Sequence, residues 1–288
     1  WHLLKTNYFS APVIVVGNIT VGGTGKTPVV IALARFLKEK GWRPGIVSRG
    51  YGGKIKHFPY QVHQNSNARE VGDEPLLIVR HTDCPTVIDP NRSRGVRALL
   101  KRAHCNLVIS DDGLQHSSLG RNIEIIVVDG ERRFGNNFCL PAGPLREPTS
   151  RLNSVDFVIS KENPLRHEFK LSLIPDHFYQ LIQPKIKKTL DYFHGKTLHA
   201  VAGIGNPDQF FNSLRKLNLK IIEHPFPDHY LFKPHDFSYG SDAIIIMTEK
   251  DAVKCVGFVD ARLWCLNTKT ELDTNLLNTV LKRVTTLN

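Results

Sequence analysis

The chain has 288 residues, of which 41% are hydrophobic and 23% charged, as is ordinary for a globular protein. No run approaches the roughly 18 consecutive apolar residues of a transmembrane helix, and no signal-peptide pattern is present, so we expect neither. The formal net charge of +11 favours an anionic partner, such as nucleic acid, phospholipid headgroups or a phosphorylated substrate. Five cysteines without a C-x-x-C pair argue against structural zinc and a disulfide framework, and favour a reducing compartment.

In chain order, the apolar pattern first predicts alternating strands and helices. The strands are expected at residues 12–16, 46–48, 86–88, 107–110, 123–128 and 157–160, and the helices at 28–40, 73–80 and 89–103. Strands that alternate with helices predict a parallel sheet with helices on both faces. The sequence therefore predicts an α/β domain over residues 1–162.

The remaining chain predicts a connection and a smaller unit. Residues 163–195 have weak patterning, several prolines and basic residues, and are expected to form a linker, with strands if any regular structure. Beyond it, strands are expected at 199–202, 220–223, 243–247 and 263–266, and helices at 207–217 and 273–284. Residues 196–288 are therefore predicted to be a second, smaller α/β domain that ends in a helix.

A glycine-rich turn between the first strand and the first helix is the strongest chemical signal. It consists of Gly22, Gly23, Thr24, Gly25, Lys26 and Thr27. Such a loop points backbone N–H groups at one anion, and the helix N-terminus adds positive potential there. In phosphate-binding loops the lysine reaches the β- and γ-phosphates and the threonine hydroxyl binds Mg²⁺. Thr20 replaces the first glycine of the strict pattern, so the sequence predicts a variant loop that binds ATP and Mg²⁺.

Two carboxylates follow an apolar strand, Leu107 to Ser110, at Asp111 and Asp112. This fold places acidic side chains near the nucleotide's Mg²⁺ in this way, although strands also end in Asp for turn reasons. Beside a glycine loop, the metal role is favoured. The sequence does not decide which of the two lies nearer the metal.

Further polar residues have both a structural and a chemical interpretation. Asp73 and Glu74 precede a helix, where a carboxylate caps the helix or acts as a general base. Arg92 lies near a helix start, where a cation opposes the helix dipole, so either an anion-binding role or a chance surface position fits. His116 lies at the mouth of the predicted sheet, where ligands bind in open α/β folds.

Two loops are ambiguous in the same way. Arg146 and Glu147 lie in a proline-flanked loop that is either a turn with a surface ion pair or part of the site. His229 follows Asp228 in the second unit, which permits a tuned imidazole.

Two further patterns are assigned structural roles. Residues 203–205 read Gly-Ile-Gly after a strand, but Asp208 occupies the third glycine position of a dinucleotide fingerprint, so a turn is expected. Thr248 and Asp251 have the spacing of a helix capping box, which accounts for the Thr-Glu-Lys-Asp stretch that they bound.

Seven short blocks in a fixed order resemble a known family. They are VVGNITVGGTGKT at 15–27, SRGYG at 48–52, GDEP at 72–75, DDGLQH at 111–116, PLREP at 144–148, FPDHY at 226–230 and TEKDAVK at 248–254. Together they resemble the tetraacyldisaccharide 4′-kinases, the lipid A 4′-kinase family, whose members share the variant glycine loop. Seven blocks in order are far more specific than any one of them.

The resemblance implies transfer of the ATP γ-phosphate to the 4′-hydroxyl of a tetraacylated glucosamine disaccharide 1-phosphate, the lipid A precursor. It places Asp73 at the family's catalytic base and His229 at the partner that assists it from the second domain. It assigns the other matching positions as follows: Lys26 and Thr27 in the phosphate loop, Asp111 and Asp112 on the metal side with Glu74, Arg92 and His116 among the catalytic polar residues, and Arg146 and Glu147 on the nucleotide side.

The resemblance also implies a location, the cytoplasmic face of the Gram-negative inner membrane. The basic charge agrees with a phosphorylated lipid on an anionic membrane surface. Residues 1–10 precede the first core strand, so we expect the family's hydrophobic N-terminal helix to be absent or reduced and the attachment to be peripheral.

Two other functions are open to a chain of this composition. A partition-type or metal-chaperone P-loop ATPase shares the Gly-Gly-x-Gly-Lys-Thr loop, but Val21 stands where such proteins carry a second lysine. A nucleic-acid-binding module would use the basic charge and leave the glycine loop unexplained. No zinc-finger spacing or RNA-recognition aromatic motif is present, so no nucleic acid is expected as a partner.

Overall fold

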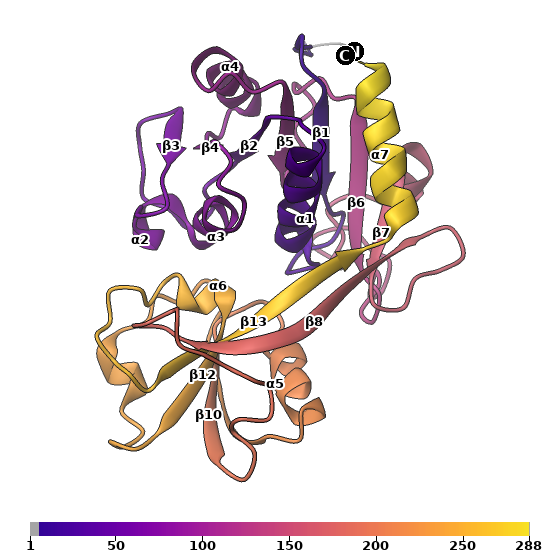
Figure 1. Cartoon of the computed structure of the whole chain (residues 1–288). Coiled ribbons are helices and arrows are strands. Elements are labelled where there is room, and N and C mark those ends of the chain that lie inside the picture. The colour runs from indigo at the N-terminus through magenta and orange to yellow at the C-terminus, as the bar shows by residue number, and fades with distance from the viewer. Residues whose placement is uncertain (1–5, 288) are drawn as a thin grey trace.

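The computed structural model describes residues 6–287 as two lobes joined by a long ribbon of two strands (Figure 1). We call residues 6–162 together with the last helix the first lobe, and residues 190–262 the second lobe. The expected reduction of an N-terminal helix concerns residues 1–10, of which residues 1–5 lie outside the described part. Within residues 6–287, no helix combines the length and the apolar composition needed to cross a membrane.

The first lobe is built on strands in the spatial order β7-β6-β1-β5-β2-β4-β3. Their bounds are β1 Val13–Gly17, β2 Pro44–Ser48, β3 Tyr60–Val62, β4 Thr86–Ile88, β5 Leu107–Asp111, β6 Ile123–Asp129 and β7 Phe157–Lys161. All neighbours are parallel except β3 and β4, which are antiparallel. Parallel strands carry their C-terminal ends to one edge of the sheet, and the loops of the site start there.

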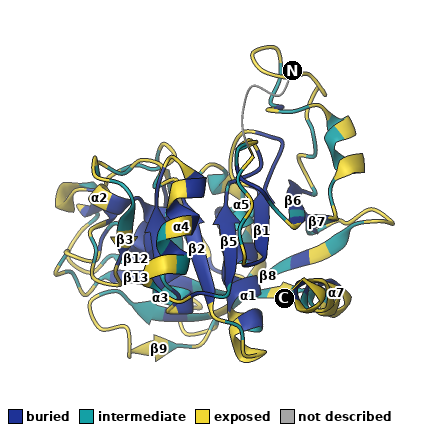
Figure 2. Ribbon diagram, turned by 90° about the horizontal axis from the view of Figure 1, so that it is seen from above, coloured by how far each residue is buried: buried dark blue, intermediate teal, exposed yellow. Residues whose placement is uncertain are grey.

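Helices cover both faces of this sheet, so the expected α/β class is confirmed. They are α1 Lys26–Glu39, α2 Ala68–Val71, α3 Asp73–Thr82 and α4 Arg92–Arg102, with a short 3₁₀ helix at Thr149–Ser154. Strand β1 shows why the chain folds this way, since every residue in it is buried. Ile14 and Val16 pack on the α1 side, while Val13 and Val15 pack on the α4 side. Figure 2 shows the central strands as the most buried part of the molecule.

The second lobe repeats the plan on a smaller scale. Strands β10 Thr197–Ala202, β11 Lys220–Pro225 and β12 Ile244–Thr248 are parallel neighbours in the order β11-β10-β12. Helix α5 Pro207–Lys216 packs on one face, and α6 Glu249–Ala252 and a 3₁₀ turn at Pro234–Phe237 pack on the other. Strands β10, β11 and β12 and helix α5 lie close to the elements predicted at 199–202, 220–223, 243–247 and 207–217.

The ribbon between the lobes includes much of residues 163–195, where the sequence predicts a connection or a strand-rich linker. The region expected to be a linker contains β8 Phe169–Gln180 and β9 Lys187–Lys188. Strand β8 pairs with β7 at one end and runs antiparallel to β13 Leu263–Leu272 along its length, which joins both lobes in one sheet. Its sequence alternates partly buried and exposed residues, because only one side of the ribbon is covered for much of its length.

The last helix belongs to the first lobe. After β13 the chain returns, and α7 Thr274–Thr286 lies along the first lobe (Figure 1). Leu276, Val280 and Val284 are fully buried in the cluster that holds α1 and β1. The sequence shows an amphipathic helix here but not which lobe its apolar stripe covers, so the expected placement in the second domain is wrong for this helix.

Removing the apolar contact of α7 should destabilise the first lobe. Leu276→Ala is expected to lower the free energy of unfolding by about 2–5 kcal/mol, because it leaves a cavity in a closed core. The exposed neighbour Asn278→Ala, on the same helix, should change it by less than about 0.5 kcal/mol. Urea unfolding of both variants measures this, and equal effects would show that α7 does not complete the first core.

Candidate functional site

The phosphate loop lies where the sequence predicts it, between β1 and α1. Gly22 and Gly25 have φ of 90° and 97°, in the left-handed region that glycine adopts without strain. Gly25 is the N-cap of α1, so the free N–H groups of the first helical turn face the loop. Thr24 is buried, and its hydroxyl has no hydrogen-bond partner among the described residues. The loop therefore offers unsatisfied donors of the kind that hold phosphate.

Neighbouring side chains and backbone fix the shape of this loop. The buried Asn18 amide donates to the Thr20 carbonyl at 2.7 Å, and Val21 N–H donates to the Pro144 carbonyl at 2.9 Å. Arg132 donates to the Gly23 carbonyl at 2.6 Å. The loop is thus held by side chains and by the segment that contains Arg146 before any nucleotide binds.

The carboxylates after β5 have different environments. Asp111 is fully buried, and its Oδ2 accepts a hydrogen bond from Ser48 at 3.0 Å, while Oδ1 finds no partner in residues 6–287. Burial, with the negative charges of Glu74 and Asp112 nearby, raises the pKa of Asp111 to about 7. A carboxylate held this way gains from a cation at its free oxygen.

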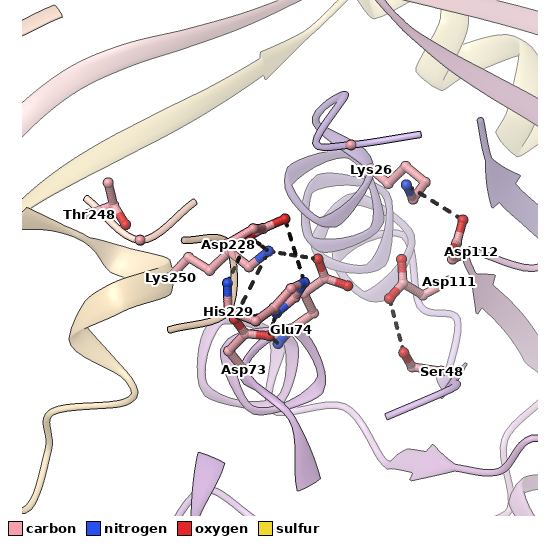
Figure 3. A network of polar contacts seen from close by, with 12 residues as sticks. Lys26, Ser48, Asp73, Glu74, Asp111, Asp112, Asp228, His229, Thr248 and Lys250 are labelled. Atoms are coloured by element: carbon pink, nitrogen blue, oxygen red, sulfur yellow. Dashed lines mark hydrogen bonds and ion pairs between the residues drawn. The ribbon is translucent and has the colours of Figure 1, made fainter. Parts of the chain in front are cut away.

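Asp112 lies between two cations. It is 3.5 Å from Lys26 Nζ and 3.2 Å from Arg146 Nη1. Burial alone would raise the pKa of Asp112, but Lys26 and Arg146 outweigh it and hold the pKa below its usual value. The arrangement links the loop lysine to the proline-flanked segment, as Figure 3 shows for Lys26 and Asp112.

Arg146 and Glu147 both reach the edge of the phosphate loop. The backbone N–H of Arg146 donates to the Ile19 carbonyl at 2.6 Å. Glu147 accepts a hydrogen bond from Gln115 at 2.7 Å, and the same Gln115 amide donates to the Asn18 carbonyl at 3.1 Å. These hydrogen bonds connect Arg146 and Glu147 to the segment that leads into the phosphate loop.

Arg92 contacts the backbone of Asp111, and His116 lies within reach of the charge of Arg92. Arg92 is buried and donates to the backbone carbonyls of Asp89 at 2.6 Å and Asp111 at 3.3 Å, while its Nε lacks a partner in the described part of the chain. Burial lowers the pKa of Arg92 to about 10, which leaves it charged at neutral pH. Burial and the charges of Arg92 and Arg49 lower the pKa of His116 to about 4, so this imidazole is neutral.

The two lobes meet at Asp73 and His229. Asp73 is the first residue of α3 and is buried, and His229 stands in the loop after β11. Nδ1 of His229 lies 3.1 and 3.0 Å from the two carboxylate oxygens of Asp73 (Figure 3). The imidazole ring of His229 also packs against the ring of Tyr51, with 5.1 Å between the ring centroids. The hydrogen bond to Asp73 raises the pKa of His229. Burial would raise the pKa of Asp73, but His229 and Lys250 together lower it.

Another turn of the second lobe reaches the phosphate loop. Residues 203–205, expected to be a turn, connect β10 to α5. A Cβ added at Gly205 would lie 3.2 Å from the backbone nitrogen of Gly23 and 3.1 Å from Asp228 Oδ2. The absence of a side chain at Gly205 lets the second lobe approach the phosphate loop this closely.

Two site residues escape the sequence reasoning. Ser48 ends β2 and binds Asp111, but a serine at a strand end carries no distinctive signal. Lys250 lies in the stretch for which the sequence predicts a helix cap. The cap is present, since the Thr248 hydroxyl accepts a hydrogen bond from Asp251 N–H at 3.1 Å. The ammonium of Lys250 instead reaches Glu74 across the lobes at 3.1 Å. No local pattern marks this contact, because Glu74 and Lys250 are 176 residues apart in the chain.

Comparison with known proteins agrees with the resemblance in the sequence. The sequence model described as LpxK, tetraacyldisaccharide-1-P 4′-kinase, matches residues 1–286. A tetraacyldisaccharide 4′-kinase of Coxiella burnetii (strain RSA 331 / Henzerling II) is 51% identical over 265 residues, which covers 92% of this chain and 78% of that protein. The Methylobacillus flagellatus enzyme of the same name is 48% identical over 288 residues, with 99% and 86% covered.

A solved structure extends the agreement to the fold. The crystal structure of LpxK from Aquifex aeolicus in complex with ATP superposes with a TM-score of 0.80 at 28% identity, and covers 98% of this chain and 91% of that one. Both lobes therefore have counterparts in a solved protein. Because the family match spans nearly every residue, the chain belongs to the tetraacyldisaccharide-1-phosphate 4′-kinase family.

Proposed function

We propose that the protein transfers the γ-phosphoryl group of ATP to the 4′-hydroxyl of tetraacyldisaccharide 1-phosphate in lipid A biosynthesis, with Asp73 as the base. The observation that carries this proposal is the contact between Asp73 and His229, at 3.0 Å, beside a loop built for phosphate. Family membership supports the reaction, and the geometry supports the roles of the residues.

The acceptor side is formed by the carboxylate–imidazole pair. Because the pKa of Asp73 is lowered, its carboxylate is ionised at neutral pH and accepts a hydrogen bond from the acceptor hydroxyl. As the hydroxyl oxygen forms its bond to the γ-phosphorus, the bond to the β-phosphate oxygen breaks and ADP leaves with that electron pair. The hydroxyl proton passes to the Asp73–His229 pair, and the products are ADP and the 4′-phosphate.

The donor side is formed by the phosphate loop. Residues 22–27 hold the phosphates through backbone N–H groups, and Lys26 stabilises the negative charge that spreads over the transferring group. Arg92 is buried beside Asp111 and supplies positive charge there. Two of its nitrogens donate hydrogen bonds to the backbone carbonyls of Asp89 and Asp111. Arg146 and Glu147 support the nucleotide side through their contacts with Asp112 and Gln115.

The residues at the loop fit Mg²⁺. The free, buried Oδ1 of Asp111 and the Thr27 hydroxyl in the first turn of α1 are oxygen ligands of the preferred kind, with Asp112 and Glu74 nearby. Residues 6–287 contain no cluster of three His, Cys, Asp or Glu side chains suited to a metal, but Mg²⁺ needs only one or two carboxylates beside substrate phosphates. When bound, Mg²⁺ neutralises phosphate charge.

The lipid acceptor implies work at a membrane surface. We infer peripheral binding at the cytoplasmic face of the inner membrane, where the net charge of +11 favours anionic headgroups. The same charge favours the 1-phosphate of the acceptor.

Transfer of the γ-phosphate to the lipid can be measured directly. ATP labelled at the γ-phosphate should yield labelled lipid from tetraacyldisaccharide 1-phosphate in detergent micelles, only with Mg²⁺ present. Lys26→Ala should reduce kcat on the order of 10²–10³-fold, because it removes a donor to the developing charge. Lys40→Ala, an exposed lysine at the other end of α1, should have little effect. ATP hydrolysis without labelled lipid would instead support a P-loop ATPase.

Substitution of Asp73 tests its proposed role as the base. Asp73→Asn keeps the size of the side chain and its bond to Glu74 N–H, and should lower kcat on the order of 10²–10⁴-fold by removing proton transfer. Asp83→Asn at the opposite end of α3 serves as the matched control. Turnover of Asp73→Asn close to wild type would disprove the assignment of the base.

The stability that His229 contributes should depend on pH. His229 has a pKa raised above 6.5 by Asp73, so its charged form stabilises the fold fully below the unfolded pKa of about 6.5, and this contribution is lost as pH rises through the folded pKa. His229→Asn should therefore destabilise the protein more at pH 6 than at pH 9. Thermal unfolding at both pH values checks this, and a pH-independent difference would contradict the ion pair.

A further inference from the structure

Lys250 reaches across the lobes to the residues that hold the acceptor side. Its Nζ lies 3.1 Å from Glu74 Oε1, 3.5 Å from Asp228 Oδ1 and 3.9 Å from Asp73 Oδ2. Figure 3 shows the ammonium among these carboxylates, with His229 beside it. The side chain is 20% exposed, so solvent screens these contacts only in part. One cation from α6 thus faces three carboxylates, two of them on α3.

The position of Lys250 is not explained by its own helix. The ion-pair partners of the ammonium, Glu74, Asp228 and Asp73, all lie outside this single-turn helix. Thr248 caps the helix, and Asp251 accepts a hydrogen bond from Gly203 N–H at 3.0 Å. The neighbouring residues therefore anchor α6 within the second lobe, and Lys250 projects from this anchored turn toward the first lobe.

The two carboxylates closest to His229 both contact Lys250. Asp73 binds Nδ1 of His229, and Asp228 Oδ2 lies 3.7 Å from Nε2 of the same ring. Without the ammonium, Asp73, Glu74 and Asp228 would be like charges gathered at one point, and phosphate groups of the substrates would add to the repulsion. Three carboxylates outweigh burial and raise the pKa of Lys250, so the positive charge persists at any working pH.

We propose that Lys250 is a positioning residue that draws the second lobe onto α3 and fixes the Asp73–His229 pair by binding the carboxylates on both sides of the imidazole. It acts through Asp73, Glu74 and Asp228 and does not itself exchange a proton or phosphate. This inference rests on the proposed function, since it concerns the geometry of the base assigned there.

The test compares three variants in the labelled-lipid assay with the full chain. Lys250→Met keeps the length and apolar stem of the side chain but removes the charge. It should lower kcat about 10- to 100-fold, the range found when a residue that orients a functional group is replaced. The KM for ATP should change little, because the phosphate loop is untouched. Lys250→Arg should recover most of the loss, and Lys216→Met, an exposed lysine on α5, should match wild type.

A double-mutant cycle shows whether Lys250 acts through the carboxylates. Combining Lys250→Met with Glu74→Gln should cost less than the product of the two single losses, because residues in contact are coupled. Thermal unfolding of each variant excludes simple misfolding as the cause. Wild-type kcat in Lys250→Met, or multiplicative losses in the cycle, would overturn the inference.

The outcomes also separate this inference from the proposed function. If the wild type labels the lipid and Asp73→Asn does not, while Lys250→Met is fully active, only the role of Lys250 fails. If the wild type makes no labelled lipid, or Asp73→Asn remains active, the proposed function or its base fails instead. A raised KM for ATP in Lys250→Met with unchanged kcat would place Lys250 at the nucleotide and overturn the positioning role.

Discussion

The parallel pairing of β1 with β5 is the contact on which the site depends. In this register Val16 lies beside Asp111, so the strand that leads into the phosphate loop and the strand that ends in the carboxylates finish at the same edge. The remaining donor-side groups are arranged around that edge: Ser48 from β2 binds Asp111, and Arg92 from the start of α4 binds its carbonyl. The register matters because the side chains of β1 alternate between the α1 side and the α4 side, so a shift by one residue would exchange the two faces and displace Asp111 from its place beside Val16.

The ribbon of β8 and β13 connects the two lobes. A kinase with a lipid acceptor must admit a large substrate and still place a base next to the phosphate loop. The two strands connect the lobes in one sheet, and α7 returns to close the first core, so the second lobe is attached at both of its ends. In the proposed reaction the acceptor side is then divided between the lobes, with Asp73 on α3 and His229 in the second lobe.

Charge balance explains how so many ionisable groups share this space. Asp112 is balanced by Lys26 and Arg146, whereas Asp73 is balanced by His229 and Lys250. Asp111 keeps a buried oxygen without a hydrogen-bond partner in residues 6–287, and the pKa of about 7 reflects the cost of ionising it there. The structure thus separates a carboxylate suited to a metal from one suited to a proton, by the cations placed beside each.

The sequence by itself determined the α/β class, the parallel strands and longer helices of both lobes, and the phosphate loop, because these depend on local patterns: apolar period, glycines at left-handed positions and a lysine at a helix start. The short elements β3 and α2 and the long, partly exposed strand β8 carry no such clear pattern. The order of the seven short blocks also determined the family resemblance, and the comparisons confirm it. The tertiary structure alone decided what lies far apart in the chain. His229 and Asp73 are separated by 156 residues, and Lys250 and Glu74 by 176. No local pattern encodes such contacts, and the same is true of α7, whose apolar stripe fits either lobe until the β8–β13 ribbon directs the chain back to the first.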